Sequence, residues 1–217
     1  MLLNRAVEED YEEIVDLANL AFRGTGVGAS WNSEADFIGG QRLDESLLRE
    51  DLATRPDAQL LTYREDPDGA LLGTVWLEPK EEGIWYLGLL TIRPDLQKKQ
   101  MGRTLLAAAE GFAKERGAHR IRMSVVNVRK PLIAWYERRG YILTRETQPF
   151  PMVMNASAGR SGMTYSSCCW RRTSKGASDS LRRMRRPRDS FLPALPREGT
   201  AGSGSEASSP DLCRWCS

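Results

Sequence analysis

The chain has 217 residues, which is enough for one domain with a sizeable core and one further segment. The first 150 residues hold 24 acidic and 20 basic side chains, whereas the last 67 hold 5 and 11, so positive charge is concentrated in the second part. No apolar run is long enough to cross a membrane and no signal peptide is recognisable, so we expect a cytoplasmic protein without a membrane partner. The four cysteines all follow residue 167, so the first part is expected to fold without disulfides.

The first 80 residues predict two helices and three strands from their apolar periodicity. In chain order these are a strand at 2–7, a helix from about residue 8, a helix after the N-cap residue Asp44, and strands at 60–63 and 71–77. The turn sequence Asp66-Pro67-Asp68-Gly69 joins the last two strands as a hairpin. A glycine-rich loop at 23–43 separates the two helices.

The next 70 residues predict three more strands and two more helices. They are a strand at 84–92, a helix from about Met101 to Gly117, a strand through 121–125, a helix from Pro131 to Gly140, and a sixth strand at 141–146. After about Met154 the apolar pattern ends and Ser, Arg and Gly dominate. We therefore predict a domain at 1–154 and a disordered tail at 155–217, which cannot bury enough surface to offset its ordering entropy.

The loop between the strand at 84–92 and the following helix is the strongest functional signal. It places basic side chains just before a helix N-terminus, where unpaired N–H groups and the helix dipole favour an anion. The sequence therefore predicts a pyrophosphate site formed by Gln97, Lys98, Lys99, Gln100, Met101, Gly102 and Arg103.

Two segments of the chain resemble the GNAT acetyltransferase family. Residues 93–106 are similar to the family's acyl-CoA loop Q/R-x-x-G-x-G/A, and residues 127–141 are similar to its N…A-x-x-F-Y-E-K-x-G-F segment. The expected element order, β-α-α-β-β-β-α-β-α-β over about residues 2–150, is also similar. The resemblance implies an α/β fold in which a mixed central sheet of about six strands carries four helices on its faces.

The resemblance also implies a cofactor and its contacts. Acetyl-CoA would be the acyl donor, and backbone N–H groups at about 98–103 would bind its pyrophosphate. Leu90 and Ile92 on the fourth strand and Asn127 after the fifth would complete the cofactor site, with Asn127 near the pantetheine or sulfur. Tyr136 would lie near the thioester and protonate the leaving thiolate as a general acid.

The sequence departs from the family pattern at two places. Gln100 replaces the first glycine of the loop motif, and its side chain can crowd the approach of the backbone to phosphate. The chain also passes from Pro149 into the tail without a recognisable seventh strand, which would leave an open sheet edge through which two copies could pair as a homodimer.

Several of these residues also have simpler interpretations. Tyr136 could be only a core residue, Asn127 a turn residue, and the basic residues of the loop a solvated charge run. His119 is expected to be structural or exposed, and the general base is expected to be water or one of Glu78, Glu81 and Glu82. Cys213 and Cys216 have zinc-ligand spacing, but the chain offers no suitable further ligands, so no metal is expected. The Arg-rich stretch 182–188 is expected to be nonspecific charge rather than a nucleic-acid site.

The function predicted first is N-acetyltransfer from acetyl-CoA to a primary amine of a small molecule or protein, by direct attack in a ternary complex. The acceptor is expected to lie against the 23–43 loop and the second helix, where Trp31 and Phe37 suggest apolar contacts and Glu34 and Asp36 suggest a cationic acceptor. The alternative is a catalytically inactive acyl-CoA-binding module, and a third hypothesis is nucleic-acid binding through the tail.

Overall fold

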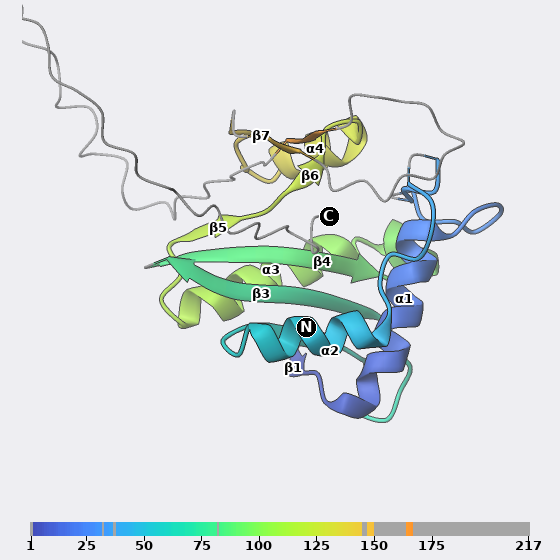
Figure 1. The fold of residues 1–217 in the computed structure, drawn as a ribbon, viewed down its shortest axis with the longest axis horizontal. Helices are drawn as coiled ribbons and strands as arrows, with labels where there is room; N and C mark the ends of the chain where they lie inside the picture. Colours follow the sequence, from blue (N-terminus) through green and yellow to red (C-terminus); the bar gives the residue numbers. More distant parts are fainter. Residues whose placement is uncertain are drawn as a thin grey trace, which may run out of the picture. The chain divides into compact units, whose positions relative to one another are not determined.

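Five strands form the central sheet in the order β1-β2-β3-β4-β5 (Figure 1). They are β1 (Asn4–Arg5), β2 (Gln59–Tyr63), β3 (Gly73–Glu81), β4 (Ile84–Ile92) and β5 (Arg120–Arg122). The first four pair antiparallel, whereas β4 and β5 run parallel. β3 and β4 are buried along most of their length, and burial on both faces explains why the sequence of β4 is a nearly continuous apolar run.

The computed structural model describes residues 2–31, 33–36, 38–81, 83–144, 147–149 and 164–166, the last two segments and Lys98 by their backbone only. All of these residues belong to one compact unit. A second unit, Thr173–Leu212, lies outside the described residues, as do all four cysteines and the Arg-rich stretch 182–188.

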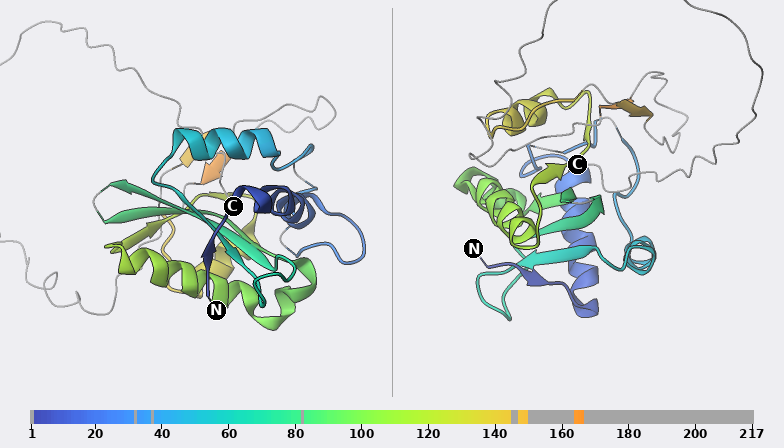
Figure 2. Two further views of the ribbon diagram at one scale, coloured as in Figure 1. Left: turned by 90° about the horizontal axis from the view of Figure 1, so that it is seen from below. Right: turned by 90° about the vertical axis from the view of Figure 1, so that its left-hand side faces the viewer.

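Helices cover both faces of the central sheet (Figure 2). The short 3-10 helix η1 (Glu8–Asp10) leads into α1 (Tyr11–Arg23), and α1 and α2 (Glu45–Thr54) pack on one face in a core around Ile14, Leu48 and Trp76. On the other face, α3 (Met101–Glu115) and α4 (Lys130–Glu137) share a second core with β3 and β4. The predicted N-cap is confirmed, because the Asp44 carboxylate accepts a hydrogen bond from the backbone N–H of Leu47 at 2.9 Å.

A bulge in β4 changes which side chains face each core. Thr74 pairs with Thr91 but Trp76 pairs with Gly88, so β4 holds one extra residue at this point, and Leu89 has a φ of 49°. Before the bulge, Leu87 packs on the α3 and α4 side. After it, Leu90 and Ile92 do, although strict alternation from Leu87 would place them on the opposite face. The bulge therefore presents both predicted cofactor residues of β4 to the α3 and α4 side.

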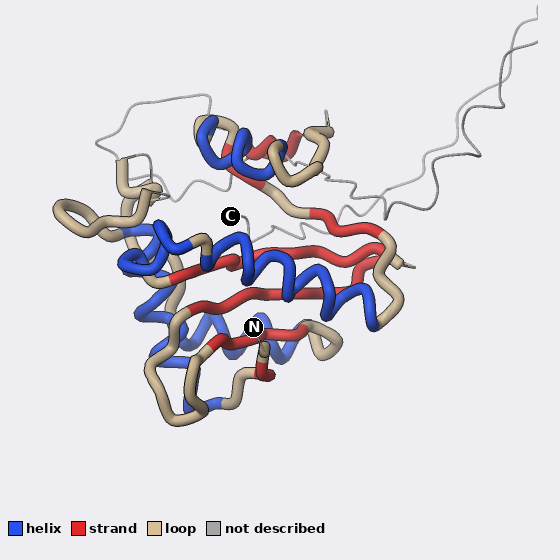
Figure 3. Tube along the Cα trace, turned by 180° about the vertical axis from the view of Figure 1, so that it is seen from behind, coloured by secondary structure: helices blue, strands red, loops and turns tan. Residues whose placement is uncertain are grey.

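The predicted fifth strand is broken into two pieces that join different sheets. β5 pairs with β4 at only three positions, and β6 (Val125–Val126) then leaves the central sheet (Figure 3). β6 belongs to a second, three-stranded sheet in the order β6-β8-β7. The strand signal at 121–125 was real, but an alternating pattern does not indicate where a strand changes its partner.

The predicted sixth strand at 141–146 is wrong in its position. α4 ends at Glu137, earlier than predicted, and a turn follows in which Gly140 has a φ of 84°. Tyr141 then packs edge-on against Tyr136, and residues 141–144 are not a strand. The strand β7 (Thr147–Pro149) begins later. Packing of the Tyr141 ring under α4 takes precedence over its strand propensity.

The sequence predicts no further strand after Pro149, but the structure contains one. β8 (Thr164–Ser166) lies between β6 and β7 and pairs antiparallel with both, so a strand comes from the segment predicted to be a disordered tail. The remainder of 150–217 lies outside the described residues. Three residues are too few to show an apolar period, and β8 gains its backbone hydrogen bonds only from partners distant in sequence.

Candidate active site

The loop after β4 presents the start of α3 in a form suited to an anion. It contains a second 3-10 helix, η2 (Pro94–Lys99), and then Gln100 in the left-handed conformation with a φ of 60°. No side chain caps α3, and its first turn contains no carboxylate. The N–H groups and dipole of this helix end are therefore not used by an acidic or capping side chain. Gln100 adopts the strained backbone geometry that glycine would adopt without cost.

A pocket of about 200 Å³ lies beside this helix end. Six of the predicted cofactor residues line it, namely Leu90, Ile92, Gln97, Gln100, Gly102 and Arg103. Tyr136, the predicted general acid, lines it as well. Lys99, Met101 and Asn127 are not among the lining residues, and the Lys98 side chain is not described.

Tyr136 is at once a core residue and a pocket residue. Its side chain is 1% exposed, and its ring makes edge-to-face contacts with Trp135 at 5.0 Å and Tyr141 at 5.6 Å between centroids. This packing fixes the ring orientation. The two interpretations of Tyr136 from the sequence are therefore compatible.

Trp135 and Arg139 also line the pocket, although neither was predicted. The guanidinium of Arg139 lies over the Trp135 ring at 3.5 Å, and its Nη1 donates to the Trp135 carbonyl oxygen at 2.7 Å. Burial, and then the charges of Arg138 and Arg103, lower the pKa of Arg139. The i, i+4 spacing of an aromatic and an arginine was the signal that could have indicated this pair.

The Gln97 side chain connects the donor loop to the 24–43 loop. Its Nε2 donates to the Ser30 Oγ at 2.7 Å, and its Oε1 accepts from the backbone N–H of Trp31 at 3.2 Å. Trp31 lines the pocket and is 51% exposed. The Gln97 carboxamide therefore holds the predicted acceptor wall against the predicted phosphate loop.

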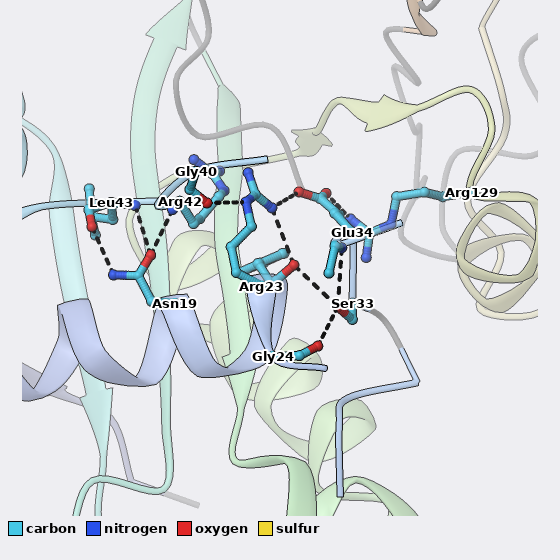
Figure 4. A network of polar contacts seen from close by, with 11 residues as sticks. Asn19, Arg23, Gly24, Ser33, Glu34, Gly40, Arg42, Leu43 and Arg129 are labelled. Atoms are coloured by element: carbon cyan, nitrogen blue, oxygen red, sulfur yellow. Dashed lines mark hydrogen bonds and ion pairs between the residues drawn. The ribbon is translucent and has the colours of Figure 1, made fainter. Parts of the chain in front are cut away.

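The expectation that Glu34 recruits a cationic acceptor is wrong, because Glu34 is occupied inside the protein. Its side chain is 2% exposed, and its carboxylate binds the Nη1 atoms of Arg23, at 2.6 Å, and of Arg129 (Figure 4). Arg129 is buried as well, and burial lowers its pKa while the charge of Glu34 opposes this effect. This network joins α1, the 24–43 loop and the turn that precedes α4.

The predicted candidates for the general base lie away from the pocket. The Glu78 carboxylate binds the Lys80 Nζ at 2.6 Å, Glu81 lies 3.9 Å from Arg122, and Glu82 is outside the described residues. No described carboxylate lines the pocket. His119 is exposed and contacts Gly83 at the opposite end of β4.

The described part of the chain holds neither a cluster of metal-ligand side chains nor a membrane-spanning helix. No group of three His, Cys, Asp or Glu side chains there is arranged to hold a metal ion. No helix there is both long enough and apolar enough to span a bilayer.

Solved N-acetyltransferase structures share this fold. The PaiA N-acetyltransferase of Thermoplasma acidophilum, solved in complex with coenzyme A, matches 76% of this chain and 98% of its own at 17% identity and a TM-score of 0.54. The ribosomal-protein-alanine N-acetyltransferase of Brucella melitensis matches 76% and 96% at 19% identity, also with a TM-score of 0.54.

The family of the chain follows from its sequence. The model of the acetyltransferase (GNAT) family matches residues 11–141, and the chain belongs to that family. Acetyl-CoA is the acyl donor of this family. The mycothiol acetyltransferase of Beutenbergia cavernae is 27% identical over 103 residues, which are 48% of this chain and 35% of that relative, so the match spans about a third of the relative's length.

Proposed function

We propose that the chain is an N-acetyltransferase that transfers acetyl from acetyl-CoA to a primary amine by direct attack in a ternary complex. One observation carries the proposal. A single pocket joins the uncapped N-terminus of α3 to the Tyr136 side chain, in a chain of an acetyltransferase family. A pyrophosphate site and a proton donor in one pocket are what acyl transfer from a CoA thioester requires.

The loop residues would hold the donor by its phosphates. The backbone N–H groups at about 98–103 belong to the loop and to the first turn of α3, which lacks an acidic cap. The Arg103 N–H donates to the Gln100 carbonyl oxygen at 3.0 Å, and the Arg103 side chain adds a positive charge at the pocket wall. Leu90 and Ile92 would form an apolar wall for the pantetheine. Asn127 precedes α4 and is not a lining residue, so its proposed contact with the donor requires the pocket to extend toward β6.

Tyr136 would act as the general acid. The bound donor supplies an activated acyl group on sulfur, and the departing thiolate requires a proton. Tyr136 holds that proton at Oη, on a ring fixed by Trp135 and Tyr141. The β4 bulge leaves its extra residue unpaired in the ladder, which supports a role for a β4 backbone N–H in binding the thioester oxygen as it gains charge.

The acceptor would enter past Trp31. Because no described carboxylate lines the pocket, we propose that water, or loss of the proton in solution, provides the free amine. The half-exposed Trp31 ring favours an acceptor with an apolar or aromatic portion beside its amine.

A second candidate is an acyl-CoA-binding module without activity. Gln100 in the left-handed position of the loop, and a pocket without a described carboxylate, favour it. Titration of the full chain with acetyl-CoA by calorimetry, followed by a thiol-release assay with a panel of amines, separates the two. Binding with turnover supports the transferase, whereas binding without turnover on any amine supports the inactive module. No binding contradicts both.

A further inference from the structure

A second groove continues from the candidate active site along α3 and the turn that follows α4. It has a volume of about 550 Å³ and is lined by Arg103, Leu106, Ala107, Glu110, Arg138 and Arg139. Arg103 and Arg139 line both this groove and the pocket of Tyr136. A ligand bound along α3 can therefore reach the groove from the pocket without leaving the protein surface.

The charge of the groove is strongly unbalanced. Three guanidinium groups face one carboxylate, that of Glu110, which already accepts a hydrogen bond from the Tyr141 hydroxyl at 2.6 Å. Among the described residues, none of the three arginines lies in an ion pair, and the buried Nε of Arg139 has no hydrogen-bond partner. Stacking on Trp135 holds the Arg139 guanidinium in place without neutralising it.

The repulsion between these arginines also favours a bound anion. Burial lowers the pKa of Arg139 most, and the charges of Arg138 and then Arg103 lower it further, so these two neighbouring charges are unfavourable for the Arg139 cation. An anion that accepts from more than one guanidinium would relieve this repulsion and use the planar donor geometry of arginine. A solvated charge run is the simpler interpretation, but it does not explain a stacked arginine whose buried Nε lacks a partner.

The phosphate groups of coenzyme A indicate which anion the groove would bind. Coenzyme A carries a pyrophosphate and, separately, a phosphomonoester on the 3′-oxygen of its ribose. The start of α3 suits the pyrophosphate, so the phosphomonoester requires a second basic region a short distance along the same surface. We propose that the groove of Arg103, Arg138 and Arg139 binds this 3′-phosphate and makes the protein select coenzyme A over 3′-dephospho-coenzyme A. This inference rests on the donor site of the proposed function.

The chain offers a matched control for Arg139. Arg116, near the other end of α3, stacks over Phe112 at 3.5 Å and donates to the Phe112 carbonyl oxygen at 3.0 Å, yet it lines neither cavity. The variants Arg139→Gln and Arg116→Gln therefore remove the same charge and the same kind of stacking, and Arg116 differs in lying 4.0 Å from the Glu115 carboxylate at an exposed position. Arg138→Gln tests an exposed arginine of the groove.

The experiment measures dissociation constants of acetyl-CoA and acetyl-3′-dephospho-CoA for the full chain and these variants by calorimetry. We expect the unsubstituted chain to prefer acetyl-CoA by about 10-fold or more, the range for charge-assisted hydrogen bonds. Arg139→Gln and Arg138→Gln should reduce that preference toward onefold, mainly by weakening acetyl-CoA binding. Arg116→Gln should leave the preference unchanged.

Three outcomes would overturn the inference. Equal affinity of the unsubstituted chain for both donors would remove the 3′-phosphate subsite while leaving the donor site in place. An equal effect of Arg116→Gln would show a general effect of net charge. Competition by inorganic phosphate as strong as that by adenosine 3′,5′-bisphosphate would show a general anion site. Failure of both donors to bind would instead contradict the proposed function itself.

Discussion

The Gln97 side chain donates a hydrogen bond to the Ser30 hydroxyl at 2.7 Å, across 67 positions of sequence. The same side chain accepts from the Trp31 N–H, so the loop predicted to bind the donor is tied to the loop predicted to form the acceptor wall. We therefore expect the Gln97 side chain to influence acceptor binding and the loop backbone to influence donor binding, which kinetic measurements can separate.

Gln97→Ala should affect the acceptor more than the donor. Without the carboxamide, Trp31 loses its anchor, so we expect the acceptor KM to rise several-fold while the acetyl-CoA Kd changes by less than about twofold, because the backbone rather than this side chain would bind phosphate. Gln41→Ala, at an exposed position of the same loop, is the control. A larger change in the acetyl-CoA Kd than in the acceptor KM would show that Gln97 belongs to the donor site.

Tyr136→Phe should lower kcat by about 100-fold or more, because it removes only the proton that the leaving thiolate needs. The aromatic packing is kept, so the acetyl-CoA Kd should change little. Tyr141→Phe is the matched control, since it also removes a hydroxyl from this cluster, the one that donates to Glu110. It should lower the melting temperature without a comparable loss of kcat. If both variants retain full turnover, Tyr136 is a packing residue.

Gln100→Gly should stabilise the protein by about 1 kcal/mol, because glycine adopts the left-handed conformation without the penalty of a side chain. The backbone of the loop would also become more accessible to phosphate, so we expect tighter acetyl-CoA binding. Urea unfolding and calorimetry measure the two effects. Gln100→Ala keeps the Cβ atom and should give neither gain, and a gain equal to that of glycine would show that the Gln100 side chain, not its conformation, is unfavourable.

Glu34→Gln should be strongly destabilising, by about 3–5 kcal/mol, because it leaves the buried guanidinium of Arg129 without its charged partner. The exposed pair of Arg49 and Glu45 provides the contrast, and Glu45→Gln should leave the unfolding midpoint nearly unchanged because solvent screens this pair. Adding Arg129→Met to Glu34→Gln should recover part of the lost stability. Similar unfolding midpoints for Glu34→Gln and Glu45→Gln would show that the buried network stabilises the protein no more than the exposed ion pair does.

A chain that ends after Met154 lacks β8 and should melt at a lower temperature than the full chain. Each kcal/mol lost corresponds to about 2–4 °C for a protein of this size. Loss of β8 also removes the hydrogen-bonding partner of β6 and β7, so we expect concentration-dependent association in sedimentation experiments, as two copies pair their strands. A chain that ends after Arg172 keeps β8 and is the control. Identical melting of the two shortened chains would show that the strand contributes no stability.

The sequence was sufficient for features that depend on local pattern. The Asp44 cap, the apolar faces of α1 and α3, and the β2–β3 hairpin all follow from periodicity and turn chemistry within short windows. The pocket residues near α3 were found for the same reason, because strand, loop and helix N-terminus are consecutive in the chain.

The features that the sequence did not predict depend on tertiary partners. Glu34 is buried because it pairs with two arginines that lie 11 and 95 positions away in the sequence. The residues next to Glu34 therefore do not indicate that its carboxylate is buried. β8 exists through ladders to strands on both sides, and Tyr141 is drawn under α4 by Tyr136. In each case a distant contact decided the outcome against a weak local preference.

The extra residue in β4 has a consequence for how the pocket can vary. Deleting Leu89 would restore regular pairing between β3 and β4. Leu90 and Ile92 would still face the α3 and α4 side, because the strand would then alternate directly from Leu87 through Gly88 to Leu90. The helices and the α3 loop could stay where they are. A one-residue deletion would thus remove the unpaired backbone group of the bulge while keeping both apolar side chains of the pocket wall, so these two contributions of β4 to the pocket can vary separately.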